Sequence, residues 1–223
     1  MKLIKSLVII TALGLVTDSA TACVEPYIGL GCEWSTTNHR RGNSHGSMFN
    51  KYFGGATAYA GARWQNISLE AGHESTGNKE KTGCHTGITS EQEVVTASIR
   101  TQNYFNGWHL DLNTYIPIKG DFEIISSLGY GIIKHRACGD ITLVTSSKTA
   151  IYEGLNFSNR YKNTVRMGIG AQQMLCNHIG IRCMVRYKLL NNRSRLKSDL
   201  FGVNEMVKYK NIVSLSLGFI AKF

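Results

Sequence analysis

The sequence has little proline and no long apolar segment beyond its first 22 residues. Only two of its 223 residues are prolines, whereas 23 are glycines, so glycine interrupts its patterns. No later segment approaches the length of a membrane-spanning helix. None of the six cysteines has C-x-x-C spacing, no glycine-rich loop suits a phosphate, and no aromatic ladder suits base stacking. Cysteine-bound metal, nucleotide and nucleic-acid functions therefore have no motif on which to rest.

The first residues have the pattern of a secretory signal peptide. Lys2 and Lys5 precede the apolar run 7–16, and 20–22 read Ala-Thr-Ala, an A-x-A cleavage site. We expect residues 1–22 to be a signal peptide and 23–223 to be the exported domain; the alternative is an uncleaved anchor or an ordinary buried segment. Cleavage would make Cys23 the first residue and suggests lipidation, but a lipoprotein usually has Leu where this chain has Ala20.

Charge and length narrow the class of protein further. The formal charge is +10, and removing the signal peptide leaves about +9 on one domain that is long enough for a core or a barrel. A basic exported protein meets acidic lipid head groups or polysaccharide more readily than nucleic acid.

Alternation of apolar and polar residues with period two, the signature of a strand, recurs along the whole exported chain. We identify eight such segments of roughly ten residues. They cover 27–34, 53–64, 67–74, 108–118, 121–133, 165–172, 179–189 and 213–223. The fold class is therefore all-β.

The polar face of these segments combines glycines with single charges of both signs. A soluble sandwich or barrel would expose this face, but such a set also suits a narrow barrel interior, where each charge needs a partner. The acidic members are Glu33, Glu70, Glu74, Asp111 and Glu123, and the basic ones are Arg63, Arg166, Arg182, Arg186, Lys188 and Lys222.

The connections between the segments alternate strictly in length. Those at 64–66, 118–121 and 175–178 are short, and those near 35–52, 76–106, 134–162 and 190–210 are long and polar. Membrane-spanning barrels have short periplasmic turns, long outer loops and aromatic girdles. Aromatic residues do fall near the strand ends: Trp34, Trp64, Trp108, Phe122, Tyr187 and Phe223. We predict an eight-stranded antiparallel up-and-down transmembrane β-barrel with a filled interior; the alternative is a secreted soluble barrel.

Several segments resemble the small outer-membrane barrels of the OmpA/OmpX type. These are PYIGLG, YFGGATAYAGARW, the pair WHLDLNTYIPI and DFEIISSLGYGI, and the ending SLGFIAKF with Phe223. The resemblance implies a Gram-negative outer membrane, with insertion by the assembly machinery through the C-terminal segment. One departure is 91–105, which is predicted to lengthen the fourth strand above the membrane or to add a strand to the eight.

The cysteines of an exported chain favour disulfides. Cys84 and Cys138 fall in the second and third long loops and are candidates for one bridge; Cys23 and Cys176 both fall at the periplasmic end. Cys32 and Cys183 are interpreted as lipid-facing strand residues. The alternative is that all six stay free.

The long loops make the outer rim basic, which suggests contact with lipopolysaccharide phosphates; the alternative is a solvated, salt-screened rim. The basic residues are Arg40, Arg41, lysines 79, 81, 148 and 162, and the run 191–197. His39 and His45 lie six residues apart, which matches no metal-ligand spacing, so neither a metal nor another cofactor is expected.

The third segment, 67–74, leads into a possible catalytic pair, His73 and Ser75. Both share the outward face of Leu69 and Ala71, two residues apart, so an imidazole there can take the proton of the hydroxyl. The H-x-S pattern resembles the H-x-S-N pattern of outer-membrane lipid A deacylases and phospholipases A, which implies that Ser75 is the nucleophile and His73 the base. This chain has Thr76 where those families have Asn. Candidates for the group that orients the imidazole are Asn106, Gln102 and Glu91.

Two functions follow from these observations. The leading hypothesis is a non-enzymatic surface protein whose basic loops bind lipopolysaccharide, host surfaces or other cells. The alternative is a lipid esterase that uses Ser75 and His73. If the protein is not an esterase, these two are simply polar residues at the point where a strand leaves the lipid.

Overall fold

The computed structural model of the chain describes residues 24–41, 51–88, 94–145, 150–157, 161–198 and 203–223. The predicted signal peptide 1–22, the lipidation candidate Cys23, the loop histidine His45 and the orienting candidate Glu91 lie outside these residues. No helix of the described part has the length and apolar character needed to cross a bilayer.

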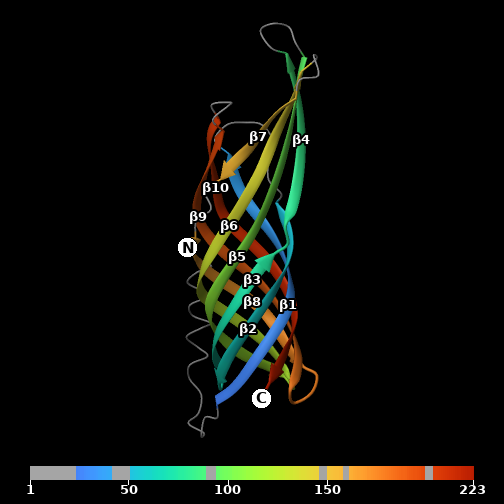
Figure 1. The fold of residues 1–223 in the computed structure, drawn as a ribbon. Helices are drawn as coiled ribbons and strands as arrows, with labels where there is room; N and C mark the ends of the chain where they lie inside the picture. Colours follow the sequence, from blue (N-terminus) through green and yellow to red (C-terminus); the bar gives the residue numbers. More distant parts are fainter. Residues whose placement is uncertain (1–23, 42–50, 89–93, 146–149, 158–160, 199–202) are drawn as a thin grey trace.

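Eight long strands form a closed antiparallel ring, which confirms the predicted eight-stranded up-and-down barrel (Figure 1). The ring closes where the first strand pairs with the last. In ring order the strands are β1 (Val24–Arg41), β2 (Tyr52–Trp64), β3 (Ile67–Thr76), β5 (Val94–Lys119), β6 (Phe122–Thr145), β8 (Tyr161–Met174), β9 (Ile179–Ser198) and β10 (Val203–Lys222). Each predicted strand segment falls within one of them, apart from the end residues Asp121 and Phe223.

Two further strands add to the eight at one end of the barrel. Strand β4 (Lys79–Ile88) pairs with Val94–Asn103 of β5, and β7 (Ala150–Phe157) pairs with Gly139–Val144 of β6 and, at its end, with Leu196 and Lys197 of β9. We call β4, β7 and the parts of β5 and β6 that pair with them the outer sheet; Figure 1 shows it rising beyond the barrel. The described part of the predicted extra segment 91–105 therefore lengthens the fourth barrel strand and leaves the ring at eight.

The short connections are tight turns at the opposite end from the outer sheet. Gln65 connects β2 to β3 with a φ of 52°, and Gly120 connects β5 to β6 with a φ of 57°. Positive φ is unfavourable for a residue with a side chain but not for glycine. The backbone oxygen of Gln65 accepts a hydrogen bond of 2.6 Å from the Arg63 guanidinium, which helps to hold this turn.

The outward face of the ring is apolar, as an inverted barrel requires. Leu30 is 66% exposed and Phe219 is 64% exposed. The tryptophans assigned to the girdles, Trp34, Trp64 and Trp108, are each more than half exposed. Cys32 and Cys183 are exposed on the same face, which confirms their outward orientation.

The interior is filled by buried ion pairs, also as predicted. Lys188 on β9 contacts Glu33 at 2.6 Å and Glu74 at 2.7 Å, and Arg166 on β8 contacts Glu74 at 2.9 Å. Arg63 on β2 forms two hydrogen bonds to Glu123 on β6, of 2.8 and 2.6 Å. Charges from opposite walls therefore meet across the barrel axis.

Apolar and aromatic layers border this charged middle. Tyr27, Tyr59 and Ile220 form a buried cluster toward the short turns. Toward the outer sheet, the Phe105 ring lies 5.2 Å from Phe53 and 4.7 Å from His135, centroid to centroid. Side chains thus occupy the barrel at both levels.

The cysteines correct the disulfide prediction. Cys84 and Cys138 are both free and exposed. Cys84 stands opposite Ser98 of β5, whereas Cys138 stands opposite Gln102 on the other side of the same strand, four residues further along. This offset keeps the two sulfur atoms apart. Cys176 is also free, and its proposed partner Cys23 lies outside the described residues.

Candidate functional site

Strand β3 carries His73 and Ser75 to the outer wall, near the level where the outer sheet begins. Burial alternates strictly along this strand, with Glu70 and Glu74 buried while His73 and Ser75 are half-buried on the outward face. The pair therefore faces the bilayer side of the barrel, as the alternation predicts.

The neighbouring strand β5 provides a partner for the histidine. Ser75 stands opposite Asn106, and His73 stands opposite Trp108. The His73 Nε2 lies 2.7 Å from the side-chain oxygen of Asn106, and the imidazole packs 4.7 Å from the Trp108 ring, centroid to centroid. The structure thus brings three sequence candidates, His73, Ser75 and Asn106, onto one small patch of the outer wall.

Of the other two orienting candidates, Gln102 does not join this patch. The side-chain oxygen of Gln102 accepts a hydrogen bond of 3.0 Å from Asn78, and its amide nitrogen donates one of 3.2 Å to Glu80. Glu91 lies outside the described residues. Thr76, where the lipid hydrolases have Asn, accepts a hydrogen bond of 2.8 Å from the backbone nitrogen of Phe105.

The hydrogen bond to Asn106 determines what the imidazole can do. An amide oxygen only accepts, so Nε2 donates in this hydrogen bond, and in the neutral imidazole Nδ1 then keeps a free lone pair. Within the described residues no hydrogen bond joins the Ser75 hydroxyl to this ring. A rotation of the two side chains is therefore needed before Nδ1 can take the hydroxyl proton.

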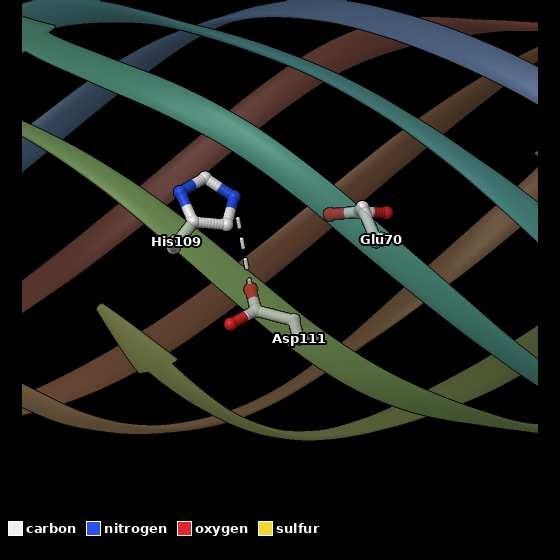
Figure 2. Close-up of side chains that lie close together, drawn as sticks. All are labelled: Glu70, His109 and Asp111. Carbon is white, nitrogen blue, oxygen red and sulfur yellow. Dashed lines mark ion pairs between the residues drawn. The ribbon is translucent and has the colours of Figure 1, made fainter. Parts of the chain in front are cut away.

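A second cluster lies inside the barrel and was not assigned from the sequence. Figure 2 shows Glu70 of β3 facing His109 and Asp111 of β5, with the side chains directed toward one another. All three are buried, and one ligand atom from each lies within 4.8 Å of the others, a spacing that a metal ion can use. Neither ring nitrogen of His109 has a hydrogen-bond partner among the described residues.

Arginines already neutralise the carboxylates of this cluster. Arg182 Nη1 lies 2.5 Å from a carboxylate oxygen of Glu70, and Arg166 Nε lies 3.2 Å from a carboxylate oxygen of Asp111. Arg186 faces both carboxylates at 3.8 and 3.9 Å. A metal cation there would leave buried guanidinium groups without counter-charges, which is costly. The cluster is better described as a node of the interior ion-pair network.

Cations backed by aromatic rings occupy the outward face just beyond Asn106. Lys134 stands opposite Asn106, and its ammonium lies 5.0 Å from the centroid of the Tyr161 ring. Arg136 donates a hydrogen bond of 2.8 Å to the Tyr104 hydroxyl. Lys79 and Lys81 at the start of β4 are exposed. The side chains of Arg40, Arg41, Lys148 and 191–197 lie outside the described residues.

Comparison with known proteins relates the chain to others only through its fold. No protein-family description matches the sequence, and no curated protein sequence matches it. Solved structures do match. The outer membrane protein OprG from Pseudomonas aeruginosa aligns with a TM-score of 0.55 and 11% identity, over 91% of this chain and 97% of that one. Neisserial surface protein A aligns with a TM-score of 0.50 and 12% identity, over 89% and 97%. The chain has the fold of the small outer-membrane β-barrels, which confirms the predicted resemblance.

Proposed function

We propose that this is a surface protein of the Gram-negative outer membrane with a binding role, in which a filled barrel anchors the outer sheet and its basic surroundings. The observation that carries the proposal is the contrast between the two parts. The barrel interior is closed by ion pairs, whereas β5 and β6 continue well past the barrel to build a sheet outside it.

The filled interior argues against transport as the main role. An eight-stranded barrel is just wide enough for its own side chains. Here Lys188, Arg166 and Arg182 reach across the interior to acidic partners on β1 and β3. The part available for contact with other molecules is therefore the outer wall and the outer sheet.

Lipopolysaccharide and host or neighbouring cell surfaces are the proposed partners. The charge of the exported chain is strongly positive, and exposed Lys79, Lys81 and Arg136 add to the basic loops at this end of the barrel. Phosphate and sulfate groups of polysaccharides are the matching counter-charges.

Trimming the outer sheet tests the proposal. One variant joins Thr76 to Phe105 and His135 to Tyr161 through short turns, which keeps the ring strands and removes β4 and β7. We expect the trimmed barrel to insert and fold but to lose binding to cultured epithelial cells and to the immobilised polysaccharide part of lipopolysaccharide, freed of lipid A. Ser75→Ala is the control and should bind normally. Equal binding by the trimmed and complete proteins would refute the proposal.

A second candidate function is hydrolysis of lipid esters, favoured by the hydrogen bond between His73 and Asn106. In this reaction the Ser75 oxygen attacks the acyl carbonyl while His73 takes its proton, and the proton then goes to the departing lipid hydroxyl. Water hydrolyses the acyl-serine with His73 again acting as base. Asn106 holds the imidazole ring in position and is itself neither protonated nor deprotonated during the reaction.

The position of the patch on the outer wall suits this chemistry. His73 and Ser75 face outward, next to the exposed ring of Trp108, so an acyl ester at the membrane interface can reach them. Mass spectrometry of lipid A and phospholipids from cells that express each variant is the test. We expect loss of an acyl chain with the wild type, none with Ser75→Ala, and partial activity with Asn106→Ala. Thr36→Ala, which removes an outward hydroxyl of β1, is the control. Identical lipid profiles for all variants would exclude the hydrolase.

A further inference from the structure

A groove of about 390 Å³ interrupts the outer wall near the outer sheet, between β8 and β9. It is present because the ladder between these strands ends at the pair Thr164 and Leu190. Beyond that pair β8 continues beside β6 as far as Tyr161, while β9 continues beside β10. The two strands therefore separate, and the surface of the wall is hollowed at this point.

The lower part of the groove is apolar. Its lining includes Tyr130 of β6, Val165 of β8 and Leu189 of β9, which point outward and are between 41% and 49% exposed. These three residues stand side by side across adjacent strands. The hydrocarbon part of a lipid is the ligand that such a surface accepts in a membrane.

The upper part of the groove is polar and contains a cation. Asn163 and Lys210 line it. Asn211 stands opposite Asn38 of β1 and Tyr209 stands opposite the next residue, His39, so Lys210 between them is the extra residue of a β-bulge. Bulges redirect a side chain relative to its neighbours, and here the redirected side chain is a lysine placed over an apolar groove.

A second groove repeats this combination elsewhere on the outer wall. It has a volume of about 550 Å³ and lies over β1, β2 and β10. Trp34, Val213 and Leu215 supply its apolar surface, and Lys79 supplies a cation. Apolar wall with one lysine toward the outer sheet is thus a recurring feature of this barrel, not a peculiarity of one bulge.

We propose that the Lys210 groove is a binding site for lipid A, the phosphorylated anchor of lipopolysaccharide. A lipid A phosphate contacts the Lys210 ammonium, and one acyl chain lies over Tyr130, Val165 and Leu189. The order of groups in the groove, apolar toward the short-turn end and cationic toward the outer sheet, matches the orientation of a lipid in the outer leaflet. This inference rests on the proposed placement of the barrel in the outer membrane, and it gives lipopolysaccharide a site on the barrel wall that is separate from the outer sheet.

Native mass spectrometry of the full exported chain, refolded in detergent, tests the site. The protein is incubated with an equimolar mixture of lipid A, dephosphorylated lipid A and phosphatidylglycerol. We expect the wild type to retain lipid A in preference to both other lipids. Lys210→Ala should lower that retention about tenfold, because it removes a charge-assisted contact to phosphate, and Lys210→Arg should preserve it.

Two further variants separate the site from general effects of charge and folding. Lys119→Ala removes a cation at the short turn between β5 and β6 and should leave lipid A retention unchanged. Val165→Trp fills the groove without a change of charge and should lower retention. Equal retention by Lys210→Ala and Lys119→Ala, or a preference for phosphatidylglycerol, would overturn the proposal. The trimmed barrel keeps the groove, so failure of the outer sheet to bind cells and failure of this site are distinguishable.

Discussion

Lys188 and Glu74 form an ion pair across the barrel, with 2.7 Å between the ammonium nitrogen and a carboxylate oxygen. The two residues lie 114 positions apart in the chain, on β9 and β3, and both side chains are almost fully buried. The same ammonium lies 2.6 Å from Glu33 on β1. One lysine therefore neutralises two carboxylates from neighbouring parts of the wall.

Replacing this lysine should destabilise the barrel strongly. Lys188→Met removes the ion pair that Glu33 makes among the described residues and leaves Glu74 paired with Arg166, and removing one partner of a buried pair costs about 3 to 5 kcal/mol. Urea unfolding in detergent micelles, followed by tryptophan fluorescence, measures the loss. Lys222→Met is the control, because its contact with half-exposed Glu25 is 3.6 Å long and should be worth less than about 1 kcal/mol. Similar losses for both variants would show that the interior network contributes little.

The filled interior also predicts that the barrel does not conduct ions. Arg182 lies between the rings of Tyr27, Tyr59 and Tyr115, at 4.9 to 5.9 Å from their centroids, and bonds to Glu70. No continuous water path is expected through that layer. Planar-bilayer recordings of the refolded protein should show no steady single-channel steps. Reproducible steps of uniform size would contradict this interior.

Added divalent metal should leave the stability unchanged. Glu70, His109 and Asp111 have metal-like spacing, but the neighbouring guanidinium groups already balance the carboxylates (Figure 2). Zinc or a chelator should therefore not shift the urea midpoint of the refolded barrel. His109→Ala is the matched variant. If zinc raises the midpoint of the wild type and not of His109→Ala, the cluster is a metal site and our description of it is wrong.

Sequence patterns predicted the architecture well because each barrel strand obeys one local rule. Period-two alternation depends only on which face is apolar, so it located all eight ring strands and assigned Arg166 and Lys188 to the interior. The partners across the barrel were not predictable, because they depend on the stagger of strands that are far apart in the chain. Glu70 faces Asp111 only in the register that β3 and β5 adopt.

The outer sheet and the patch at His73 show the same limit. Strand β4, KEKTGCHTGI, has no apolar alternation, because it is held by pairing with β5 and not by burial of one face in a core. Parity alone placed both Asn106 and Gln102 on the outward face. The register then selects Asn106, since it stands opposite Ser75.

The cysteines provide a test of the orientation of the barrel. Cys84 and Cys138 are free and exposed on the outer sheet, so a membrane-impermeant maleimide should label both in intact cells without a reductant. Cys32 and Cys183 are exposed on the lipid-facing wall and should remain unlabelled. Cys176, beside a short turn, should react only after the outer membrane is permeabilised. Peptide mass spectrometry assigns the labels. Labelling of Cys84 and Cys138 only after reduction would show that they are bridged in the cell.

The closing seam of the barrel should depend on a pair of glycines. Gly31 of β1 stands opposite Gly218 of β10, and a Cβ atom on Gly218 would lie 2.8 Å from the Gly31 Cα and closer still to the backbone oxygen of Leu30. Because these atoms belong to the main chain of the partner strand, they cannot move without separating the two strands. Gly218→Ala should therefore destabilise the closed barrel by about 2 kcal/mol or more.

Gly54→Ala is the control, since a Cβ there meets nothing within 4 Å. Unheated gel samples should show less of the compact, heat-modifiable form for Gly218→Ala and a normal amount for Gly54→Ala. Equal behaviour would mean that the seam between β1 and β10 is looser than the structure indicates.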